Sequence, residues 1–364
     1  RDVGTVSCWG KRTELGGHTY LFTFGNTDND TGRTYVKFQN TDTLRVGGGA
    51  TLWRETDRLF RDTANWYHIV VAFDTTQSTA NDRIKIYING VQETSFSTTN
   101  NPSQNDNLGI NFEKQVIGYN SIDNSDGFNG YMCEICYQDG TASAPTEFGE
   151  FDSDSGIWKP IDVASKPSGT NKFYLDFEDS SNLGNDVSGG TDFTENNIAA
   201  ADQATDTCTN NFCIVNNNTR QGNQYGGYTT SQQATNGGTV IREPTGSFGQ
   251  ISGTIGVGSG KWYWEIKAVG MTGFYTAGQI YGITSPINLG GSESRSEIRP
   301  GATTAVDTSA QYAIYPAYPD QTRSIEGTTE SSTHWTSSDE GAANDVIWRI
   351  ALDLDNGKIW YGRN

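Results

Sequence analysis

Three acidic residues in the middle of the chain are the first candidates for chemistry. Glu147, Glu150 and Asp152 fall within one hexapeptide. Glycoside hydrolysis requires two carboxylates that flank the scissile bond, roughly 5 to 9.5 Å apart. Because the surrounding stretch is rich in turn-forming residues, a solvated loop explains the three acids without catalysis. We therefore expect no catalytic pair here.

A C-x-x-C pair, Cys133 and Cys136, would suit a zinc or redox site. It lies within residues 131–137 (YMCEICY), a stretch typical of a strand. Residues three apart in a strand point to opposite faces, which would separate the two sulfurs. No second pair of this kind and no histidine pair completes a tetrahedral site, so we expect buried structural thiols.

Two further cysteines, Cys208 and Cys213, are close enough in sequence to close a small loop with a disulfide. The chain has five cysteines in all, and an odd number argues against a fully oxidised framework. The sequence leaves the redox state of this pair open.

Nucleophilic and phosphate chemistry find no support. The chain has three histidines and no G-x-S-x-G motif, and no glycine-rich run is followed by Lys-Ser or Lys-Thr. His68 alternates with Trp66 and Val70, so we expect it to lie on a buried face of a strand, in the core or in a layer next to it. The sequence predicts a protein that is not an enzyme and has no catalytic residues.

Aromatic residues outside regular runs are candidates for binding sugars, because ring faces stack on the apolar faces of pyranoses. Trp53, Tyr119, Tyr315 and Trp335 lie outside clean alternating runs and are candidates for exposed ligand-binding residues. For Tyr315 and Trp335 a packed loop is the favoured interpretation.

Four oxygen-rich turns raise the possibility of calcium, at residues 28–32, 123–127, 152–156 and 353–357. None fits the twelve-residue EF-hand loop, which needs further ligands and a closing glutamate. The preference of Asp, Asn and Gly for turns explains each of them.

Short strands must position all these residues. Tyr20, Phe22 and Phe24 alternate and should share one face, and residues 66–73 are apolar on both faces, as expected of a central strand. Ile84, Ile86 and Ile88 alternate with polar residues and lead into Asn89-Gly90, a two-residue hairpin turn. The pattern predicts an all-β fold.

Composition narrows the class of protein. With 364 residues, 12% of them aromatic, the chain is too long for one hydrophobic core. Its formal net charge of −18 would repel the phosphate backbone of a nucleic acid. We expect two domains and no nucleic-acid partner. No window approaches the roughly 18 to 20 apolar residues of a membrane span, so we expect no membrane insertion.

The first 150 residues carry a resemblance in ordered motifs. These motifs are residues 7–12 (SCWGKR), 66–69 (WYHI), 84–90 (IKIYING), 117–118 (IG) and 128–131 (FNGY). Together they resemble a laminin-G-like, concanavalin A-like jelly roll, a β-sandwich that hosts lectins, hydrolases and adhesion modules. Jelly-roll hydrolases typically use Glu-x-Asp-x-x-Glu, which this chain lacks. The resemblance implies a strand before Ser7, so the N-terminal edge is expected to be truncated.

The same resemblance bears on calcium. Laminin-G-like and pentraxin-like proteins often bind calcium at one rim of the sandwich. It implies that, if a calcium site exists, Asp123 and Asp126 are its first candidates. No other cofactor is expected.

Residues 151–236 form a polar, loop-rich connector with too few apolar residues for a core of its own. We expect it to pack on the first domain through Phe173, Leu175 and Phe177. Residues 169–186 and 207–212 resemble a block found after such domains in structural proteins of marine bacteriophages. That origin is implied by the resemblance alone.

Residues 237–364 again alternate as strands. The motifs at 260–265 (GKWYWE), 280–282 (IYG) and 351–362 (ALDLDNGKIWYG) resemble a SPRY domain, a β-sandwich that recognises proteins through its loops. The resemblance implies further strands after Asn364, so this domain is expected to be incomplete. The chain is thus predicted to hold two antiparallel β-sandwich (jelly-roll) domains, 1–150 and 237–364, joined by the connector.

These expectations combine into a hypothesis of function. The chain is interpreted as a non-catalytic appendage protein, such as a fibre or decoration protein, on the surface of a phage virion. Its partners would be host-surface glycans or neighbouring virion proteins. Phage fibres are commonly trimers, so a homo-oligomer is expected, although no residue marks a trimer seam. A secreted bacterial adhesin or lectin is the alternative, followed by a glycan hydrolase.

Overall fold

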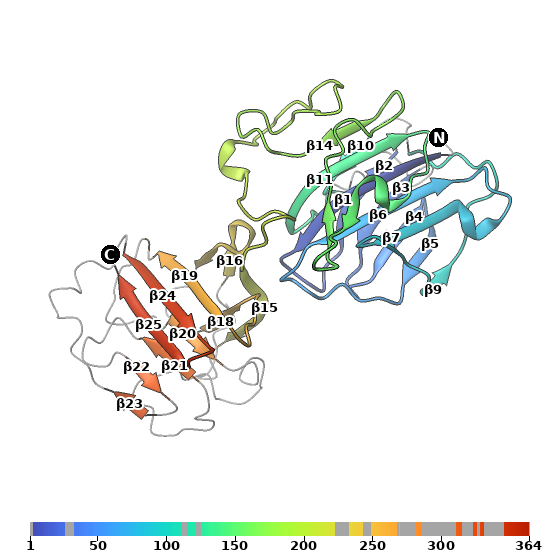
Figure 1. Cartoon of the computed structure of the whole chain (residues 1–364). Helices are drawn as coiled ribbons and strands as arrows, with labels where there is room; N and C mark the ends of the chain where they lie inside the picture. Colours follow the sequence, from blue (N-terminus) through green and yellow to red (C-terminus); the bar gives the residue numbers. More distant parts are fainter. Residues whose placement is uncertain are drawn as a thin grey trace. The chain divides into compact units, whose positions relative to one another are not determined.

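The computed structural model describes most of the first 222 residues and shorter stretches of the remainder. The described residues are 3–25, 33–110, 115–120, 125–222, 233–242, 249–267, 269, 281–284, 311–314, 323–325, 328–330 and 346–363. The chain divides into two units, Arg1–Ile214 and Val215–Asn364, and each is described by itself (Figure 1).

Strands dominate both units. Within the described residues the only helices are four short 3-10 helices, at Ala80–Arg83, Pro145–Glu147, Ala200–Asp202 and Asn236–Gly238. The predicted all-β fold class is confirmed. Among these elements, none is a helix long and apolar enough to cross a membrane.

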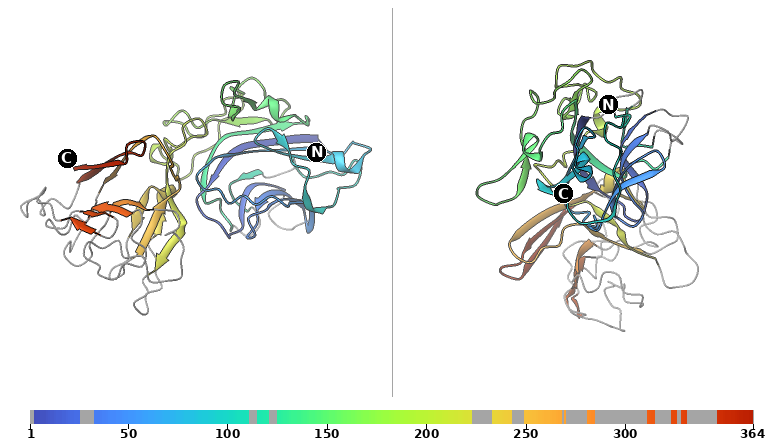
Figure 2. Two further views of the ribbon diagram at one scale, coloured as in Figure 1. Left: turned by 60° about the horizontal axis from the view of Figure 1, so that its bottom comes forward. Right: turned by 90° about the vertical axis from the view of Figure 1, so that its right-hand side faces the viewer.

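The first unit contains two six-stranded antiparallel sheets, which Figure 2 shows stacked as two layers. Sheet A has the order β14-β11-β1-β6-β7-β8, with bounds Phe173–Leu175, Gly130–Asp139, Val3–Arg12, Tyr67–Asp74, Ile84–Ile88 and Val91–Gln92. Sheet B has the order β10-β2-β3-β4-β5-β9, with bounds Gln115–Ile117, Thr19–Phe24, Thr34–Phe38, Leu44–Gly48, Thr51–Thr56 and Phe96–Thr99. As predicted, β6 is a central strand, and Asn89 and Gly90 form the β7–β8 turn with positive φ angles of 48° and 79°.

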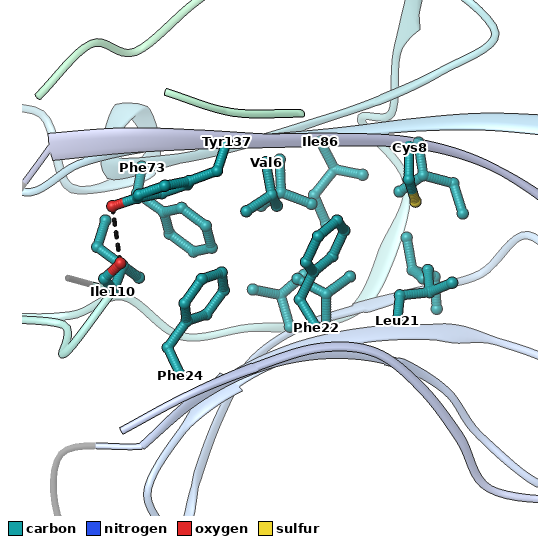
Figure 3. Close-up of a cluster of buried hydrophobic side chains, with 14 of the residues drawn as sticks. Val6, Cys8, Leu21, Phe22, Phe24, Phe73, Ile86, Ile110 and Tyr137 are labelled. Carbon is teal, nitrogen blue, oxygen red and sulfur yellow. Dashed lines mark hydrogen bonds between the residues drawn. The ribbon is translucent and has the colours of Figure 1, made fainter. Parts of the chain in front are cut away.

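Apolar side chains from the inner faces of both sheets form the core (Figure 3). Phe22 and Phe24 of sheet B are buried together with Val6 and Phe73 of sheet A. Each such side chain contributes roughly 1.5 to 3 kcal/mol through burial. The Tyr137 hydroxyl donates to the carbonyl of Ile110 at 2.7 Å, so the one polar atom of this ring is paired in the apolar interior.

A bulge in β2 corrects the expected alternation of that strand. Tyr20 pairs with Lys37 and Phe22 pairs with Val36, the next residue of β3. Leu21 is therefore an extra residue in β2, a β-bulge. Phe22 and Phe24 therefore face the core, whereas Tyr20 lies on the outer face of sheet B. The expectation that all three share one face was wrong because the extra residue, Leu21, reverses the pleat.

A second bulge corrects the expectation for the C-x-x-C pair. Cys136 pairs with Ser7 and Cys133 with Trp9, so β11 carries one extra residue opposite β1, and Glu134 has a φ of +51°. Both cysteines consequently lie on the outer face of sheet A rather than on opposite faces. The two thiols are nevertheless free and buried, as expected of structural cysteines.

The chain after residue 145 covers the outer face of sheet A. β14 pairs with β11, and its residues Phe173 and Leu175 are buried in the core, with Phe177 packed beside it. A short hairpin of β12 (Gly149–Phe151) and β13 (Trp158–Pro160) brings the Trp158 indole over Gly90, where a Cβ atom would overlap the ring. Trp158 joins Trp9, Trp66 and Cys133 in one buried cluster.

A buried ion pair anchors the end of this cover. Lys11 on the outer face of β1 is fully buried, and its ammonium donates to the Asp206 carboxylate at 2.7 Å, to Asn211 Oδ1 at 2.8 Å and to the Phe212 carbonyl at 2.6 Å. All three ammonium protons are therefore used. The indole of Trp66 donates to the other Asp206 oxygen at 3.0 Å. Residues 206–212 are thus fixed to two adjacent strands.

The second unit contains four sheets within its described residues. A three-stranded sheet, sheet G, has the order β19-β24-β25, with bounds Lys261–Lys267, Ile347–Asp353 and Lys358–Arg363. A four-stranded sheet has the order β20-β21-β22-β23, with bounds Tyr281–Thr284, Gln311–Ile314, Arg323–Ile325 and Thr328–Glu330. Two antiparallel strand pairs complete it, β15 (Val215–Gly222) with β18 (Gly249–Gly253) and β16 (Gln233–Thr235) with β17 (Val240–Arg242). The predicted pairing of residues 346–354 with the strand at 358–362 is confirmed.

The buried ion pair predicts a large loss of stability on substitution. Asp206→Asn should lower the free energy of unfolding by about 3 to 5 kcal/mol, because it leaves the Lys11 ammonium buried without its counterion. Urea unfolding of the full chain measures this loss. The matched control is Glu147→Gln, which removes an exposed pair with Lys166 and should cost no more than about 1 kcal/mol. Equal effects of the two substitutions would contradict the role of Asp206.

Thiol labelling provides a second test. Cys213 is exposed and Cys208 half-buried, whereas burial raises the pKa of the Cys8 and Cys136 thiols and thereby removes the reactive thiolate. In the native chain a maleimide should modify Cys213 first and Cys208 more slowly, with the other three reacting only after unfolding. Mass spectrometry identifies the sites. Rapid native labelling of Cys133 or Cys136 would show that the cover over sheet A opens.

Candidate functional site

The outer face of sheet B carries a row of polar and aromatic residues across four strands. Tyr20 pairs with Lys37, Lys37 with Arg45, and Arg45 with Glu55, so one residue from each of β2, β3, β4 and β5 lies in register. The side chains of Phe22 and Phe24, from the same sheet, point into the core (Figure 3). We refer to Tyr20, Tyr35, Lys37, Arg45 and Glu55 as the sheet B row.

Two tyrosines form the base of the row. The rings of Tyr20 and Tyr35 meet edge to face, with centroids 6.0 Å apart. The Lys37 ammonium donates to the Tyr20 hydroxyl at 3.2 Å and lies 4.8 Å and 5.4 Å from the centroids of the Tyr20 and Tyr35 rings. The Arg33 guanidinium lies 5.1 Å from the Tyr35 centroid. Because both tyrosines are buried, their rings position the half-buried cations rather than offer a stacking surface.

An ion pair forms the other half of the row. Arg45 Nη2 lies 3.0 Å from Glu55 Oε2, with 27% and 13% of the two side chains exposed. Thr43 donates its hydroxyl to the other Glu55 oxygen at 2.8 Å. Arg45 Nε is buried and has no hydrogen-bond partner within the described residues. The guanidinium of Arg45 is partly accessible, whereas its Nε is not.

Glycine 47 makes the packing of Tyr35 possible. It pairs with Tyr35 across β3 and β4, and a Cβ atom at this position would overlap the Tyr35 hydroxyl and lie 2.7 Å from the Thr51 carbonyl oxygen. The ring of Tyr35 thus occupies the space that a side chain would take. In the sequence, the only sign of this close packing is the run of three glycines at residues 47–49.

The loop after β10 lies beside the Tyr20 end of the row. Thr23 donates to the Tyr119 carbonyl at 2.9 Å, and the Tyr20 amide donates to the Asp126 carbonyl at 3.1 Å. Arg33 donates to Asn120 Oδ1 at 3.3 Å. The structure therefore brings two predicted site residues, Tyr119 and Asp126, to the edge of the sheet B row. Tyr119 is half-buried and Asp126 is exposed.

The other predicted binding residues have different outcomes. The exposure expected of Trp53 was wrong: only 6% of it is exposed, because its indole packs into the core over Gly48, where a Cβ atom would overlap the ring. Asp123, Tyr315 and Trp335 lie outside the described residues. In the described part of the chain no three acidic, histidine or cysteine side chains are grouped to hold a metal ion.

Sequence reasoning missed Tyr20, Lys37, Arg45 and Glu55 as members of one site. Alternation within each strand places Lys37 and Arg45 on an outer face, but their alignment depends on the register between strands. The bulge at Leu21, which turns Tyr20 outward, leaves no mark in the residue pattern.

A serine–histidine pair on sheet A resembles a catalytic arrangement but has the wrong proton placement. His68 Nδ1 accepts a hydrogen bond from the Trp158 indole at 2.8 Å, so the ring proton lies on Nε2 and is donated to Ser7 Oγ, 2.9 Å away. A general base would need a free lone pair on that nitrogen. Burial lowers the pKa of His68 to about 3, which keeps it neutral, and the predicted buried histidine is confirmed.

The carboxylates considered for hydrolysis are surface ion pairs. Glu147 lies 3.2 Å from Lys166, and Lys159 lies 3.4 Å from Glu150 and 3.1 Å from Asp152. More unusual is Glu134, whose pKa is raised to about 7 by burial and by the nearby Asp176 and Glu178, although the Tyr174 hydroxyl donates to it. Glu134 lies beside the cover of sheet A, on the sheet opposite the sheet B row.

Comparison with known proteins identifies the first unit at the level of the fold. The family described as the concanavalin A-like lectin/glucanases superfamily matches residues 2–145. No curated protein is similar enough in sequence to match the chain. Residues 2–145 are thus similar to this superfamily, and the two stacked antiparallel sheets agree with a jelly-roll fold.

Solved structures similar to the chain come from several sources. A carbohydrate-binding module of family 40 from a Ruminococcus gnavus sialidase, bound to α2,3-sialyllactose, is 15% identical with a TM-score of 0.28, over 35% of this chain and 70% of its own. A pentraxin from Limulus polyphemus is 16% identical with a TM-score of 0.27, over 39% and 66%. Domain 4 of an arabinanase from Geobacillus stearothermophilus, in complex with arabinotriose, is 20% identical with a TM-score of 0.27, over 39% and 63%.

The buried neutral state of His68 predicts a pH effect. Its pKa is near 6.5 when unfolded and about 3 when folded, so between these values the unfolded chain binds more protons and stability falls as the pH falls. From pH 7 to pH 5 this costs about 2 kcal/mol. Glu134, with its raised pKa, acts in the opposite direction over the same range.

The measurement is therefore the difference between the full chain and its His68→Gln variant in urea unfolding at pH 7 and pH 5. The variant keeps a polar side chain that does not titrate, so its stability should fall by about 2 kcal/mol less between the two pH values. A difference that is constant with pH would indicate that the pKa of His68 is the same in the folded and the unfolded chain.

Proposed function

We propose that the first unit is a non-catalytic glycan-binding module that uses the outer face of sheet B. The observation that carries this proposal is the sheet B row, which holds two partly accessible cations and a carboxylate in fixed geometry. Directional hydrogen bonds to hydroxyl groups need rigid donors and acceptors, and the tyrosine base and the Arg45–Glu55 pair supply that rigidity.

Charge favours an acidic sugar. Arg33, Lys37 and Arg45 outnumber Glu55 on this face, although the chain as a whole has a net charge of −18. A guanidinium forms paired hydrogen bonds with a carboxylate or sulfate, and 27% of the Arg45 side chain is exposed on this face. The superfamily match to residues 2–145 supports carbohydrate binding as the class of activity.

The proposal excludes hydrolysis on the described residues. Glu147, Glu150 and Asp152 are engaged with lysines at the surface, and the Ser7–His68 pair holds its proton on the wrong nitrogen. Neither group lies on sheet B. Calcium at Asp123 and Asp126 remains part of the proposal, because Asp126 lies at the edge of the row.

For the biological setting we propose the surface of a phage particle, where glycan binding would serve attachment to a host. This placement, a trimeric assembly and contacts with other virion proteins rest on the resemblance of the connector to phage structural proteins. A secreted adhesin would use the same binding face.

The test is binding of the full chain to an array of neutral and acidic glycans and to candidate host cells, with calcium and with a chelator. Lys37→Ala and Arg45→Ala should each weaken binding of an acidic glycan about tenfold or more, since each removes a charge-assisted contact of roughly 1.5 to 3 kcal/mol. Loss of binding with the chelator would support the calcium site.

Lys159→Ala is the matched control, because Lys159 is a half-exposed, ion-paired cation on the β12–β13 hairpin. It should leave binding unchanged. If Arg45→Ala and Lys37→Ala bind as tightly as the unmodified chain, the sheet B row is not the binding face.

A further inference from the structure

Sheet G of the second unit presents two large aromatic residues to solvent. Tyr263 of β19 pairs with Ala351 of β24, and Ala351 pairs with Trp360 of β25, so the three residues form one row across the sheet. Figure 1 shows these strands side by side, in orange to red. Tyr263 is 59% exposed and Trp360 is 51% exposed. We call this row, with its flanking charged residues, the sheet G face.

Among the described residues, the buried cluster of the second unit does not include these rings. The opposite face of the same strands carries the buried cluster of Val346, Trp348 and Ile350, against which Trp264 and Ile359 pack. Tyr263 and Trp360 therefore contribute little to folding, and their position on a paired three-stranded sheet makes them rigid. Exposed aromatic residues on a rigid support are characteristic of binding surfaces.

The geometry suits a linear ligand. Ala351 lies between the two aromatic residues, which are therefore two strand spacings, about 10 Å, apart. The side chain of Ala351 is a single methyl group, so the sheet surface between the two rings is flat. Two aromatic rings at this separation can contact two different sugar units of one extended chain. The Tyr263 hydroxyl is held by a hydrogen bond to Glu265 Oε1 at 2.5 Å, which fixes the orientation of its ring.

Charged residues border the aromatic row on both sides. Along one side, Lys261 and Lys358 flank Asp353, with Lys261 Nζ 3.6 Å from the aspartate. Along the other, Arg349 lies 3.4 Å from Glu265 and opposite Gly362, which adds no side chain. With Lys267 at the end of β19, four cations oppose two anions on this face of an acidic chain.

This composition disfavours other occupants. The apolar part is only two rings and one alanine, bordered on both sides by charged residues, whereas the core of a protein interface is larger and poor in charge. A second copy would bring the same net positive surface against itself, and like charges in contact are unfavourable. An anionic ligand with apolar ring faces fits both features.

We infer that the sheet G face binds an acidic polysaccharide, whose sugar rings lie on Tyr263 and Trp360 and whose carboxylate or sulfate groups contact the flanking lysines and Arg349. This second site is separate from the sheet B row and depends on different residues. A polysaccharide long enough to reach both sites would bind more tightly than to either site alone.

The experiment measures binding of the full chain to polygalacturonate, dextran sulfate and neutral dextran by affinity electrophoresis. Trp360→Ala and Tyr263→Ala should each weaken binding of at least one anionic polymer about tenfold, while Trp360→Phe keeps most of it. Polygalacturonate and dextran sulfate distinguish carboxylate from sulfate recognition. Neutral dextran should bind weakly.

Controls separate this site from the first. Phe151→Ala removes an equally exposed aromatic residue, 53% accessible, from the first unit and should have no effect. Arg45→Ala should leave the contribution of the sheet G face intact, so loss of one site does not mimic loss of the other. Near-ultraviolet circular dichroism confirms that each variant is folded.

Three results would overturn the inference. One is unchanged binding of both anionic polymers by Trp360→Ala and Tyr263→Ala. Another is equally tight binding of neutral dextran. The third is a concentration-dependent oligomer of the unmodified chain, in sedimentation, that Trp360→Ala dissociates, which would identify a second copy as the occupant.

Discussion

The first unit depends on covering an apolar outer surface of sheet A with chain that has little regular structure. Trp9, Trp66 and Cys133 face outward from this sheet, and exposing them to water would be costly. The cover is held by a polar anchor, the buried Lys11–Asp206 pair, in which every ammonium proton has an acceptor. Without such an anchor a loop of this length has few backbone hydrogen bonds to keep it in place.

The two sheets have different roles for this reason. The core buries the inner face of sheet A and the cover buries its outer face. Polar groups under the cover, such as His68 and Ser7, are therefore buried, and His68 stays neutral. Sheet B keeps a polar outer face with cations held above two tyrosines. The chain as a whole is acidic, yet this face and the sheet G face both carry more cations than anions. Folding does not require such local excesses of positive charge.

Much of the fold could be predicted from the sequence, because alternation and turn residues act locally. The β7–β8 turn at Asn89-Gly90 and the central position of β6 follow from such patterns. The sheet B row could not be predicted, since its members meet through inter-strand register and through the bulge at Leu21. The bulge at Glu134 likewise placed Cys133 and Cys136 on one face. Trp53 was misassigned because Gly48, on the neighbouring strand, admits the indole to the core.

The cover over sheet A also determines how short a recombinant fragment of the first unit can be if it is to fold by itself. A recombinant fragment cut at residue 145, where the superfamily match ends, would lack Trp158, Tyr174 and Asp206. It would expose the outward tryptophans and remove the counterion of Lys11. Such a fragment would tend to aggregate, whereas one that ends at Ile214 keeps the whole layer. Domain boundaries drawn from sequence similarity therefore cut this protein about 70 residues too early for biochemical work.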